Sequence, residues 1–329
     1  MTSVVSAATL PLVSVVAPFY NEEASLRALL ERLVKTAGTL DESYRFEFLF
    51  VDDGSTDSSL QTALALRAVE PRLRVIQLRR NYGQTAALQA GLDSAHGEII
   101  VSMDADLQHF PEEIPRFLEK LEEGSDVVCG WRRERQEDWK RRWPSSAANY
   151  LIRRISGLSI HDVGTTYRAY RREIVRDLRL LGENHRFIPA FAKVVGARID
   201  EIPIENVVRP HGQSNYGLGR TLNVFIDLFF LYFFTRYADR PIRIFGKVSL
   251  GLLGIGILIA FGLLVEYAAT GRPVVRERSG WFMLSSFLML TAVQVLLTGI
   301  LAELLARVYF ARDDRTSYQI RGEWPTPGA

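Results

Sequence analysis

Cysteine is nearly absent from this sequence, and its net charge is small. Cys129 is the single cysteine among 329 residues, which excludes an internal disulfide framework and fits a reducing compartment for the soluble part. We interpret Cys129 as a buried free thiol. The 40 Lys and Arg residues against 38 Asp and Glu leave a formal charge of +2, too little for a general attraction to nucleic acid. We therefore expect no nucleic-acid partner, and any recognition of anions must be local.

Two further features are missing. The N-terminal residues are apolar but lack the basic start of a secretory signal, so we interpret them as leading into a first strand and not as an export signal. The five histidines show no metal-binding spacing, so we predict no zinc site. We interpret each of them as a polar surface or loop residue: His96, His109, His161, His185 and His211.

From Leu12 to about Gly130 the chain repeats one pattern, in which a short apolar run is followed by a polar turn and a helical stretch. This alternation predicts a parallel sheet covered by helices. In open α/β sheets ligands bind outside the carboxyl ends of the strands. We expect strands at LVSVVAP, FEFLFVDD, LRVIQL, EIIVSMDAD and DVVCG, which end at Pro18, Asp53, Leu78, Asp106 and Gly130.

Acidic residues stand at the end of the fourth of these strands, in the motif MDADLQ. Asp104 and Asp106 stand there with one residue between them, and hard divalent cations such as Mg²⁺ prefer oxygen ligands and keep substrate phosphates or waters in their other positions. A D-x-D triplet alone is a weak signal, because paired acids in a turn are usually solvated. Its place at a strand end, after two earlier strand ends with acidic residues, favours a metal and diphosphate site.

The two earlier strand ends carry Glu22 and Asp53. In APFYNEE, Tyr20 offers a ring to a planar base and Glu22 a hydrogen-bond acceptor, although a proline turn that starts a helix is an equally good reading. In VDDGSTD, Gly54 permits a tight turn after Asp53, and here the plain alternative is a helix cap.

The C-terminal third changes in character. Residues 248–265 and 281–302 are uncharged, and their lengths are close to the roughly 20 residues that cross a bilayer as a helix. We predict two transmembrane spans at about 246–268 and 281–303; the alternative is a buried soluble hairpin. Before them, residues 222–237 are apolar but short and contain Asp227, which favours an interfacial helix over a third span.

Four motifs follow one another along the first part of the chain: PFYNEE, VDDGSTD, NYGQTAALQAG and DADLQHFPEEIP. In order and spacing they resemble the family 2 glycosyltransferases of the GT-A fold. The later segments GTTYRAYRREIV, NHRFIPAFA and IPIENVVRPHGQSNYG, with the paired spans, resemble polyprenyl-phosphate glycosyltransferases, including dolichyl-phosphate mannosyltransferases and undecaprenyl-phosphate formyl-aminoarabinose transferases. The resemblance covers nearly the whole chain. It implies a Rossmann-like, mostly parallel sheet with helices on both faces.

The resemblance also implies roles for individual residues. Asp104, Asp106 and Gln108 would surround Mg²⁺ or Mn²⁺ and the diphosphate, with Asp106 central to catalysis. Asp162 matches a position sometimes proposed as the base, and we expect it to orient groups or to pair with Arg168. The residues implied in donor binding are Pro18, Tyr20, Glu22, Asp53, Asp104, Arg132, Arg209 and Asn215.

At Asn215 the chain departs from the family, which has lysine in this place within G-x-S-K-Y. Asparagine brings no positive charge, so phosphate binding would shift to Arg209, His211 or Arg220. The acceptor or the donor is then open to differ from the usual ones.

The expected reaction is inverting transfer of a sugar from a UDP- or GDP-linked donor to a polyprenyl phosphate, either undecaprenyl or dolichyl. The implied protein is an integral membrane homo-oligomer with its catalytic domain in the cytosol, most simply at a bacterial inner membrane. We divide the chain into a catalytic domain (1–218), an interfacial segment (219–243), a transmembrane hairpin (244–306) and a cytosolic tail (307–329).

Two alternatives stay open. A processive polysaccharide synthase of the same fold would need more spans and usually a Q-x-x-R-W motif, which the segment KRRW ending at Trp143 does not complete. A catalytically inactive membrane scaffold would not need Asp104, Asp106 and Gln108, which are intact here.

Overall fold

The computed structural model of the protein describes residues 10–133, 157–176, 184–205, 232–233, 237, 240–271, 273–310 and 320–324. The chain forms two compact units. The first comprises Met1–Leu231 with Thr316–Ala329, and the second comprises Tyr232–Arg315.

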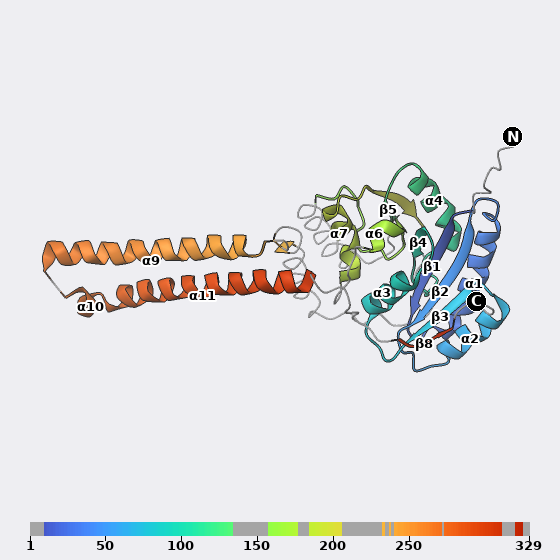
Figure 1. The fold of residues 1–329 in the computed structure, drawn as a ribbon, viewed down its shortest axis with the longest axis horizontal. Helices are drawn as coiled ribbons and strands as arrows, with labels where there is room; N and C mark the ends of the chain where they lie inside the picture. Colours follow the sequence, from blue (N-terminus) through green and yellow to red (C-terminus); the bar gives the residue numbers. More distant parts are fainter. Residues whose placement is uncertain are drawn as a thin grey trace, which may run out of the picture. The chain divides into compact units, whose positions relative to one another are not determined.

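The first unit is built on an eight-stranded sheet with the order β7-β5-β6-β4-β1-β2-β3-β8 (Figure 1). Strands β6 and β8 run antiparallel to their neighbours, and the other six run in one direction. This confirms the predicted α/β fold with a mostly parallel sheet. The strands are β1 (Leu12–Phe19), β2 (Arg45–Asp52), β3 (Leu73–Leu78), β4 (Ile99–Ser102), β5 (Val127–Arg132), β6 (Arg168–Arg171), β7 (Ile199–Ile204) and β8 (Ile320–Trp324).

Strand β4 is shorter than the sequence predicts. It ends at Ser102, so Asp104 and Asp106 lie in the turn that follows it and not within the strand. Leu107, directly after Asp106, has a positive φ of 63°, which is uncommon for a residue with a side chain. The backbone therefore bends sharply where the acidic pair stands.

Helices cover both faces of the sheet. Helix α1 packs its leucines against one face, in a core that includes Val13 and Val15 of β1. Helix α3 packs on the other face, where a Cβ added to Gly91 would lie 2.3 Å from Cγ1 of Val16. The helices of this unit are α1 (Glu23–Gly38), α2 (Ser59–Val69), α3 (Gln84–Ser94), α4 (Ile114–Glu122), α6 (Arg172–Arg176) and α7 (Ile188–Val194), with short 3-10 turns η1 (Pro111–Glu113) and η2 (Asn184–Phe187).

The single cysteine lies on β5, the second strand from one edge of this sheet. Cys129 on β5 is a buried free thiol, which confirms the interpretation from the sequence. Burial raises its pKa to about 12, so the group stays a neutral thiol at physiological pH.

Strand β8 was not predicted. It lies in the segment that we assigned to a cytosolic tail, and it adds an antiparallel edge to β3, with Trp324 opposite Val75. Trp324 also packs against the hydrophobic core. The five residues are few and mixed in character, so no hydrophobic period marked them as a strand.

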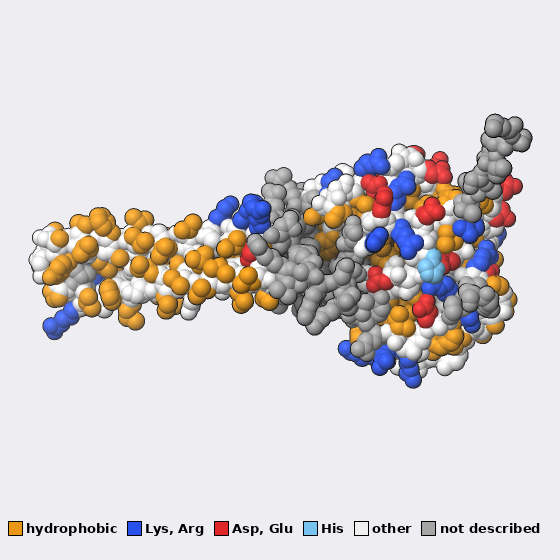
Figure 2. All heavy atoms as spheres, in the orientation of Figure 1, with side chains coloured by type: hydrophobic (Ala, Val, Ile, Leu, Met, Phe, Trp, Pro, Cys, Tyr) orange, Lys and Arg blue, Asp and Glu red, His pale blue; other side chains and the backbone are white. Residues whose placement is uncertain are grey.

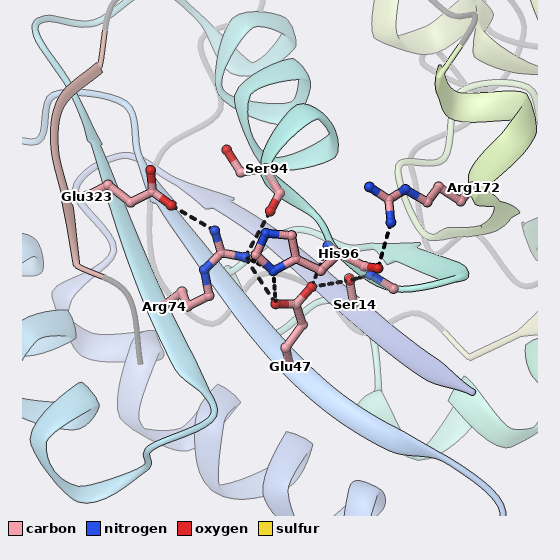
Figure 3. A network of polar contacts seen from close by, with 8 residues as sticks. Ser14, Glu47, Arg74, Ser94, His96, Arg172 and Glu323 are labelled. Carbon is pink, nitrogen blue, oxygen red and sulfur yellow. Dashed lines mark hydrogen bonds and ion pairs between the residues drawn. The ribbon is translucent and has the colours of Figure 1, made fainter. Parts of the chain in front are cut away.

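A buried ion-pair network fastens β8 to the amino-terminal end of the sheet (Figure 3). Arg74 lies between two carboxylates, at 3.0 Å from Glu47 and 2.7 Å from Glu323 of β8. Glu47 also accepts hydrogen bonds from the Ser14 hydroxyl and the His96 backbone N–H. Burial alone would raise the pKa of Glu47, but these bonds and the Arg74 guanidinium lower it.

The second unit is a pair of long helices joined by a short one: α9 (Ile242–Thr270), α10 (Val274–Glu277) and α11 (Ser279–Phe310). Two stretches, Ile242–Thr270 and Ser279–Leu305, are long and apolar enough to cross a membrane. Hydrophobic side chains cover the outside of both helices (Figure 2). These helices agree with the two predicted spans and begin a few residues earlier than predicted.

Small residues and hydroxyl groups hold the helix pair together. The Ser249 hydroxyl donates to the carbonyl of Ala292 across the pair (2.7 Å), and the Ser285 hydroxyl donates to the carbonyl of Gly256 (2.8 Å). A Cβ at Gly256 would lie 2.8 Å from Cγ of Met289 and 3.2 Å from the carbonyl oxygen of Ser285, so a larger residue would force the Met289 side chain to shift. Close packing through small residues with interhelical hydrogen bonds is typical of helices in a bilayer. Most of the predicted interfacial segment lies outside the described residues.

The network at β8 leads to a prediction about stability. Arg74→Met should lower the free energy of unfolding by about 3–5 kcal/mol, because it leaves the Glu47 carboxylate buried without its cation. Glu323→Gln should lower the free energy of unfolding by only about 0–1 kcal/mol, because the Glu323 side chain is 39% exposed and the ion pair between Arg74 and Glu47 remains. Thermal unfolding of the detergent-solubilised protein measures both, and equal losses would contradict this order.

Candidate active site

The residues that the sequence singles out at the strand ends line one open cleft of about 380 Å³. Pro18, Tyr20 and Glu22 come from the end of β1 and the turn after it, Asp53 follows β2, and Asp104 and Asp106 follow β4. Because β1, β2 and β4 are parallel neighbours, their carboxyl ends meet at the same edge of the sheet. The fold thereby brings together side chains that are up to 88 residues apart in the sequence.

The carboxylate of Asp53 is held by backbone N–H groups of the loop before α3. Tyr82 donates to one oxygen (2.8 Å) and Gly83 to the other (2.9 Å). Burial raises the pKa of Asp53, and these two bonds oppose the effect. Gly83, with a φ of 93°, takes a conformation in which the loop can turn both N–H groups toward one carboxylate.

Gly54, the residue after Asp53, lies against the same loop. A Cβ there would stand 2.5 Å from the carbonyl carbon of Arg80, and its φ of 71° also disfavours a side chain. Gly54, which the sequence predicts in a tight turn, therefore also lets its backbone approach the backbone at Arg80 closely.

Asp104 is held by two neutral side chains. The Gln84 amide donates to Oδ1 at 2.6 Å, and the Thr166 hydroxyl donates to Oδ2 at 2.7 Å. The carboxylate of Asp106 accepts a hydrogen bond from the backbone N–H of Gln108 (3.1 Å). Asp104 and Asp106 therefore stand beside each other with fixed orientations.

These oxygens fit a hard divalent cation. Within the part of the chain that the structure describes, no group of three or more His, Cys, Asp or Glu could hold a metal ion by itself. Asp104 and Asp106 offer carboxylates on the wall of the cleft, which suits Mg²⁺ or Mn²⁺ that takes its other ligands from water and a diphosphate. Gln108 lies beside the pair but not among the residues that line the cleft.

Asp162 has a partner other than the one suggested from the sequence. Asp162 is buried, and its carboxylate accepts hydrogen bonds from Nε (2.7 Å) and Nη2 (3.2 Å) of Arg132, which lies at the end of β5. The Gly164 N–H also donates to it, at 3.1 Å. Asp162 therefore fixes the direction of the Arg132 guanidinium.

Arg168 is engaged elsewhere. It is fully buried, and its guanidinium donates to the backbone carbonyls of Val163, His185 and Arg186. The interpretation of Arg168 as a partner of Asp162 is replaced by one in which Arg168 braces the backbone behind the site.

The interpretation of the histidines as surface or loop residues was wrong for His185, which is buried in η2. His109 lies in a loop but is buried as well. Burial lowers the pKa of His109 to about 4, and neither ring nitrogen has a hydrogen-bond partner among the described residues. His185 contacts the Thr85 hydroxyl at 2.7 Å. Neither residue stands in a run with a hydrophobic period that would indicate burial from the sequence.

Three residues of the site were not among the predicted site residues. Asn81, Gly83 and Gln84 line the cleft, and the signal that could have identified them is their place in the motif NYGQTAALQAG. Two predicted donor-binding residues, Arg209 and Asn215, lie outside the described residues.

Comparison with known proteins gives consistent matches. The family model for Glycosyl transferase family 2 matches residues 14–179. The chain is 41% identical over 313 residues to a dodecaprenyl-phosphate galacturonate synthase of Rhizobium johnstonii, which covers 94% of this chain and 91% of that protein. It is 42% identical to an undecaprenyl-phosphate 4-deoxy-4-formamido-L-arabinose transferase of Pseudomonas aeruginosa, over 91% of this chain and 86% of that one.

Solved structures match part of the chain. A glucosyl-3-phosphoglycerate synthase from Mycobacterium tuberculosis, crystallised with Mn²⁺, UDP-glucose and phosphoglyceric acid, is 21% identical to this chain. The match covers 68% of this chain and 79% of that one, with a TM-score of 0.49.

The buried His185 predicts how stability depends on pH. Burial, with Arg186 and Arg168 nearby, lowers its pKa to about 3, against 6.5 for an ordinary histidine. Between these values the unfolded chain binds a proton that the folded chain does not. The free energy of unfolding should therefore fall as the pH drops below 6.5, with His185 contributing about 1.4 kcal/mol per pH unit.

His185→Gln removes this titration, so urea unfolding of the variant should depend less steeply on pH in that window. The same slope in both proteins would contradict the prediction.

Proposed function

The chain belongs to glycosyl transferase family 2, and from that premise we propose that it is a polyprenyl-phosphate glycosyltransferase. It moves a sugar from a nucleoside diphosphate donor to the phosphate of a polyprenyl lipid. The observation that carries the proposal is the cleft in which Asp53, Asp104 and Asp106 meet at one edge of the sheet.

The donor fits this cleft as follows. Tyr20, 43% exposed at the rim, offers its ring to the base, and Glu22 and Asp53 accept hydrogen bonds from the nucleoside. Asp104 and Asp106 would hold Mg²⁺ or Mn²⁺, with the diphosphate supplying further oxygen ligands. The bound cation would supply Lewis-acid stabilisation of the negative charge that develops on the leaving diphosphate.

The acceptor needs no strong base. A phosphate monoester has a second pKa near about 6, so the lipid phosphate is largely dianionic at neutral pH. One of its oxygens attacks the anomeric carbon, and the bond from that carbon to the diphosphate oxygen breaks. No proton has to move, and attack from the side opposite the leaving group inverts the anomeric configuration.

Arg132 suits the lipid phosphate or the diphosphate. Its guanidinium is directed by Asp162 through two hydrogen bonds, which is the geometry of a preorganised anion ligand. Asp162 is engaged by a cation, and we assign it the orienting role and not that of a general base.

The membrane part suits an acceptor that stays in the bilayer. A polyprenyl chain remains in the hydrocarbon layer, so a soluble donor has to be brought to its headgroup. The helices α9 and α11 would anchor the enzyme there, with the catalytic unit on the cytosolic side, where nucleotide sugars occur.

The two curated relatives suggest which donors to test first. Their names specify galacturonate and 4-deoxy-4-formamido-L-arabinose as the transferred sugars. Both relatives match this chain at nearly equal identity. Sequence similarity therefore does not identify the transferred sugar, which has to be determined by testing several nucleotide sugars as donors.

The two alternatives are less well supported. Within the described residues two helices are long enough to cross a membrane, whereas a processive synthase needs further spans for a channel. An inactive scaffold has no need of an acidic pair whose orientation is fixed by hydrogen bonds.

The proposal predicts different outcomes for two acidic residues. Asp106→Ala should abolish metal-dependent turnover, because it removes a ligand of the cation. Asp162→Asn should retain measurable activity, because an amide can still accept a hydrogen bond from Arg132 and no proton has to be abstracted. Initial rates of lipid-linked sugar formation measure both, and complete loss in both variants would contradict the orienting role of Asp162.

The reaction itself is tested by transfer of radiolabel from a panel of UDP- and GDP-sugars to undecaprenyl phosphate in detergent, with and without Mn²⁺. The panel includes UDP-galacturonate and UDP-4-deoxy-4-formamido-L-arabinose, and Asp106→Ala is the control. We expect metal-dependent product with one donor. A folded wild-type protein that binds no nucleotide would instead favour the scaffold.

A further inference from the structure

We propose that Gln84 and Thr166 are positioning residues that fix the carboxylate of Asp104 for the divalent cation. This inference rests on the proposed function and adds to it two side chains that do not themselves belong to the metal or donor ligands assigned above. Each would act through Asp104, by restricting how that carboxylate can turn.

Each carboxylate oxygen of Asp104 accepts a hydrogen bond from one of these two side chains. The Gln84 Nε2–Oδ1 distance of 2.6 Å is short for an N–H···O bond, and the Thr166 Oγ1–Oδ2 distance of 2.7 Å is ordinary for a hydroxyl that donates to a carboxylate. The two donors come from segments that lie 20 residues before and 62 residues after Asp104 in the sequence. Because both oxygens are held, the carboxylate cannot rotate about the Cβ–Cγ bond without breaking a hydrogen bond.

Thr166 is itself anchored to the strand that leads to Asp104. The Ser102 hydroxyl, at the last residue of β4, donates to the carbonyl oxygen of Thr166 at 2.7 Å. The hydroxyl of Thr166 then reaches Asp104, two residues beyond Ser102. The two bonds close a small ring between the end of β4 and the segment that leads into β6, so Thr166 has little freedom to move away.

Gln84 is anchored through the loop that holds Asp53. It is the first residue of α3, and the two residues before it, Tyr82 and Gly83, donate their N–H groups to Asp53. The side chain of Gln84 is exposed and lines the cleft, so packing in the core does not dictate its orientation. The same loop therefore sets the positions of the nucleoside carboxylate and of the metal carboxylate.

The chemistry of the two donors matters as much as their positions. An amide and a hydroxyl orient a carboxylate and leave its full negative charge in place. A lysine or arginine in the same position would neutralise that charge and compete with the cation. Without either donor, Asp104 would be free to turn away from Asp106, which carries a like charge. Outer-shell partners of this kind typically change metal affinity by about 10–100-fold when they are removed.

The test measures Mn²⁺ binding directly, by the electron paramagnetic resonance signal of free Mn²⁺, with the full-length protein in detergent and UDP or GDP present. Thr166→Val removes the hydroxyl and keeps the shape, and Thr166→Ser keeps the hydroxyl. Gln84→Met removes the amide at similar length. Thr36→Val is the matched control, because Thr36 is a buried threonine in α1 whose hydroxyl has no hydrogen-bond partner among the described residues.

We expect Thr166→Val and Gln84→Met each to weaken Mn²⁺ binding by about 10-fold. Thr166→Ser should restore wild-type affinity, and Thr36→Val should not change it. The thermal unfolding midpoint and nucleotide binding without metal should stay the same in all four variants. In turnover, the half-saturating Mn²⁺ concentration should rise while the rate at excess Mn²⁺ recovers.

Wild-type Mn²⁺ affinity in both Thr166→Val and Gln84→Met would overturn the positioning role and leave the proposed function intact. Equal losses in Thr166→Val and Thr166→Ser, accompanied by a lower unfolding midpoint, would overturn it in favour of a purely structural role. A folded wild-type protein that binds no Mn²⁺ with either nucleotide would overturn the proposed function and this inference together.

Discussion

Three carboxylates, Asp53, Asp104 and Asp106, converge in one cleft at the carboxyl edge of the sheet, and like charges brought together there repel one another. The protein holds them with neutral donors: backbone N–H groups for Asp53 and Asp106, and an amide and a hydroxyl for Asp104. Such donors fix the orientation of a carboxylate without neutralising its negative charge. In the proposed function, the negative charge of these carboxylates would serve to bind a cation together with the diphosphate of the donor.

At the opposite end of the same sheet, carboxylates are paired with a cation. There Glu47 is paired with Arg74, and Arg74 reaches on to Glu323 of β8, so charge is balanced inside the protein (Figure 3). This cluster includes the edge strand that the chain forms after the second apolar helix. One end of the sheet is thus built for stability and the other for binding, and the segment after the helix pair is part of the catalytic unit.

The sequence predicted those features that depend on local pattern. Asp53, Asp104 and Asp106 could be identified because parallel strands align their carboxyl ends, and the two long helices could be identified from uncharged length alone. Partnerships across long sequence distances could not. Thr166 with Asp104, and Arg132 with Asp162, depend on which strands become neighbours, and no spacing rule contains that information. Strand β8 is stabilised by pairing with β3 and by Arg74, so its own five residues gave little sign of it.

The most direct test of the account is the position of the metal. Crystals or frozen particles of the full chain with Mn²⁺ and the nucleoside diphosphate that binds would show where the ion lies, and anomalous scattering would identify it as Mn²⁺. The account predicts one ion between Asp104 and Asp106, bound to carboxylate and diphosphate oxygens, with the base beside Tyr20 and Asp53. An ion held elsewhere, or a diphosphate bound in this cleft without any ion, would contradict it.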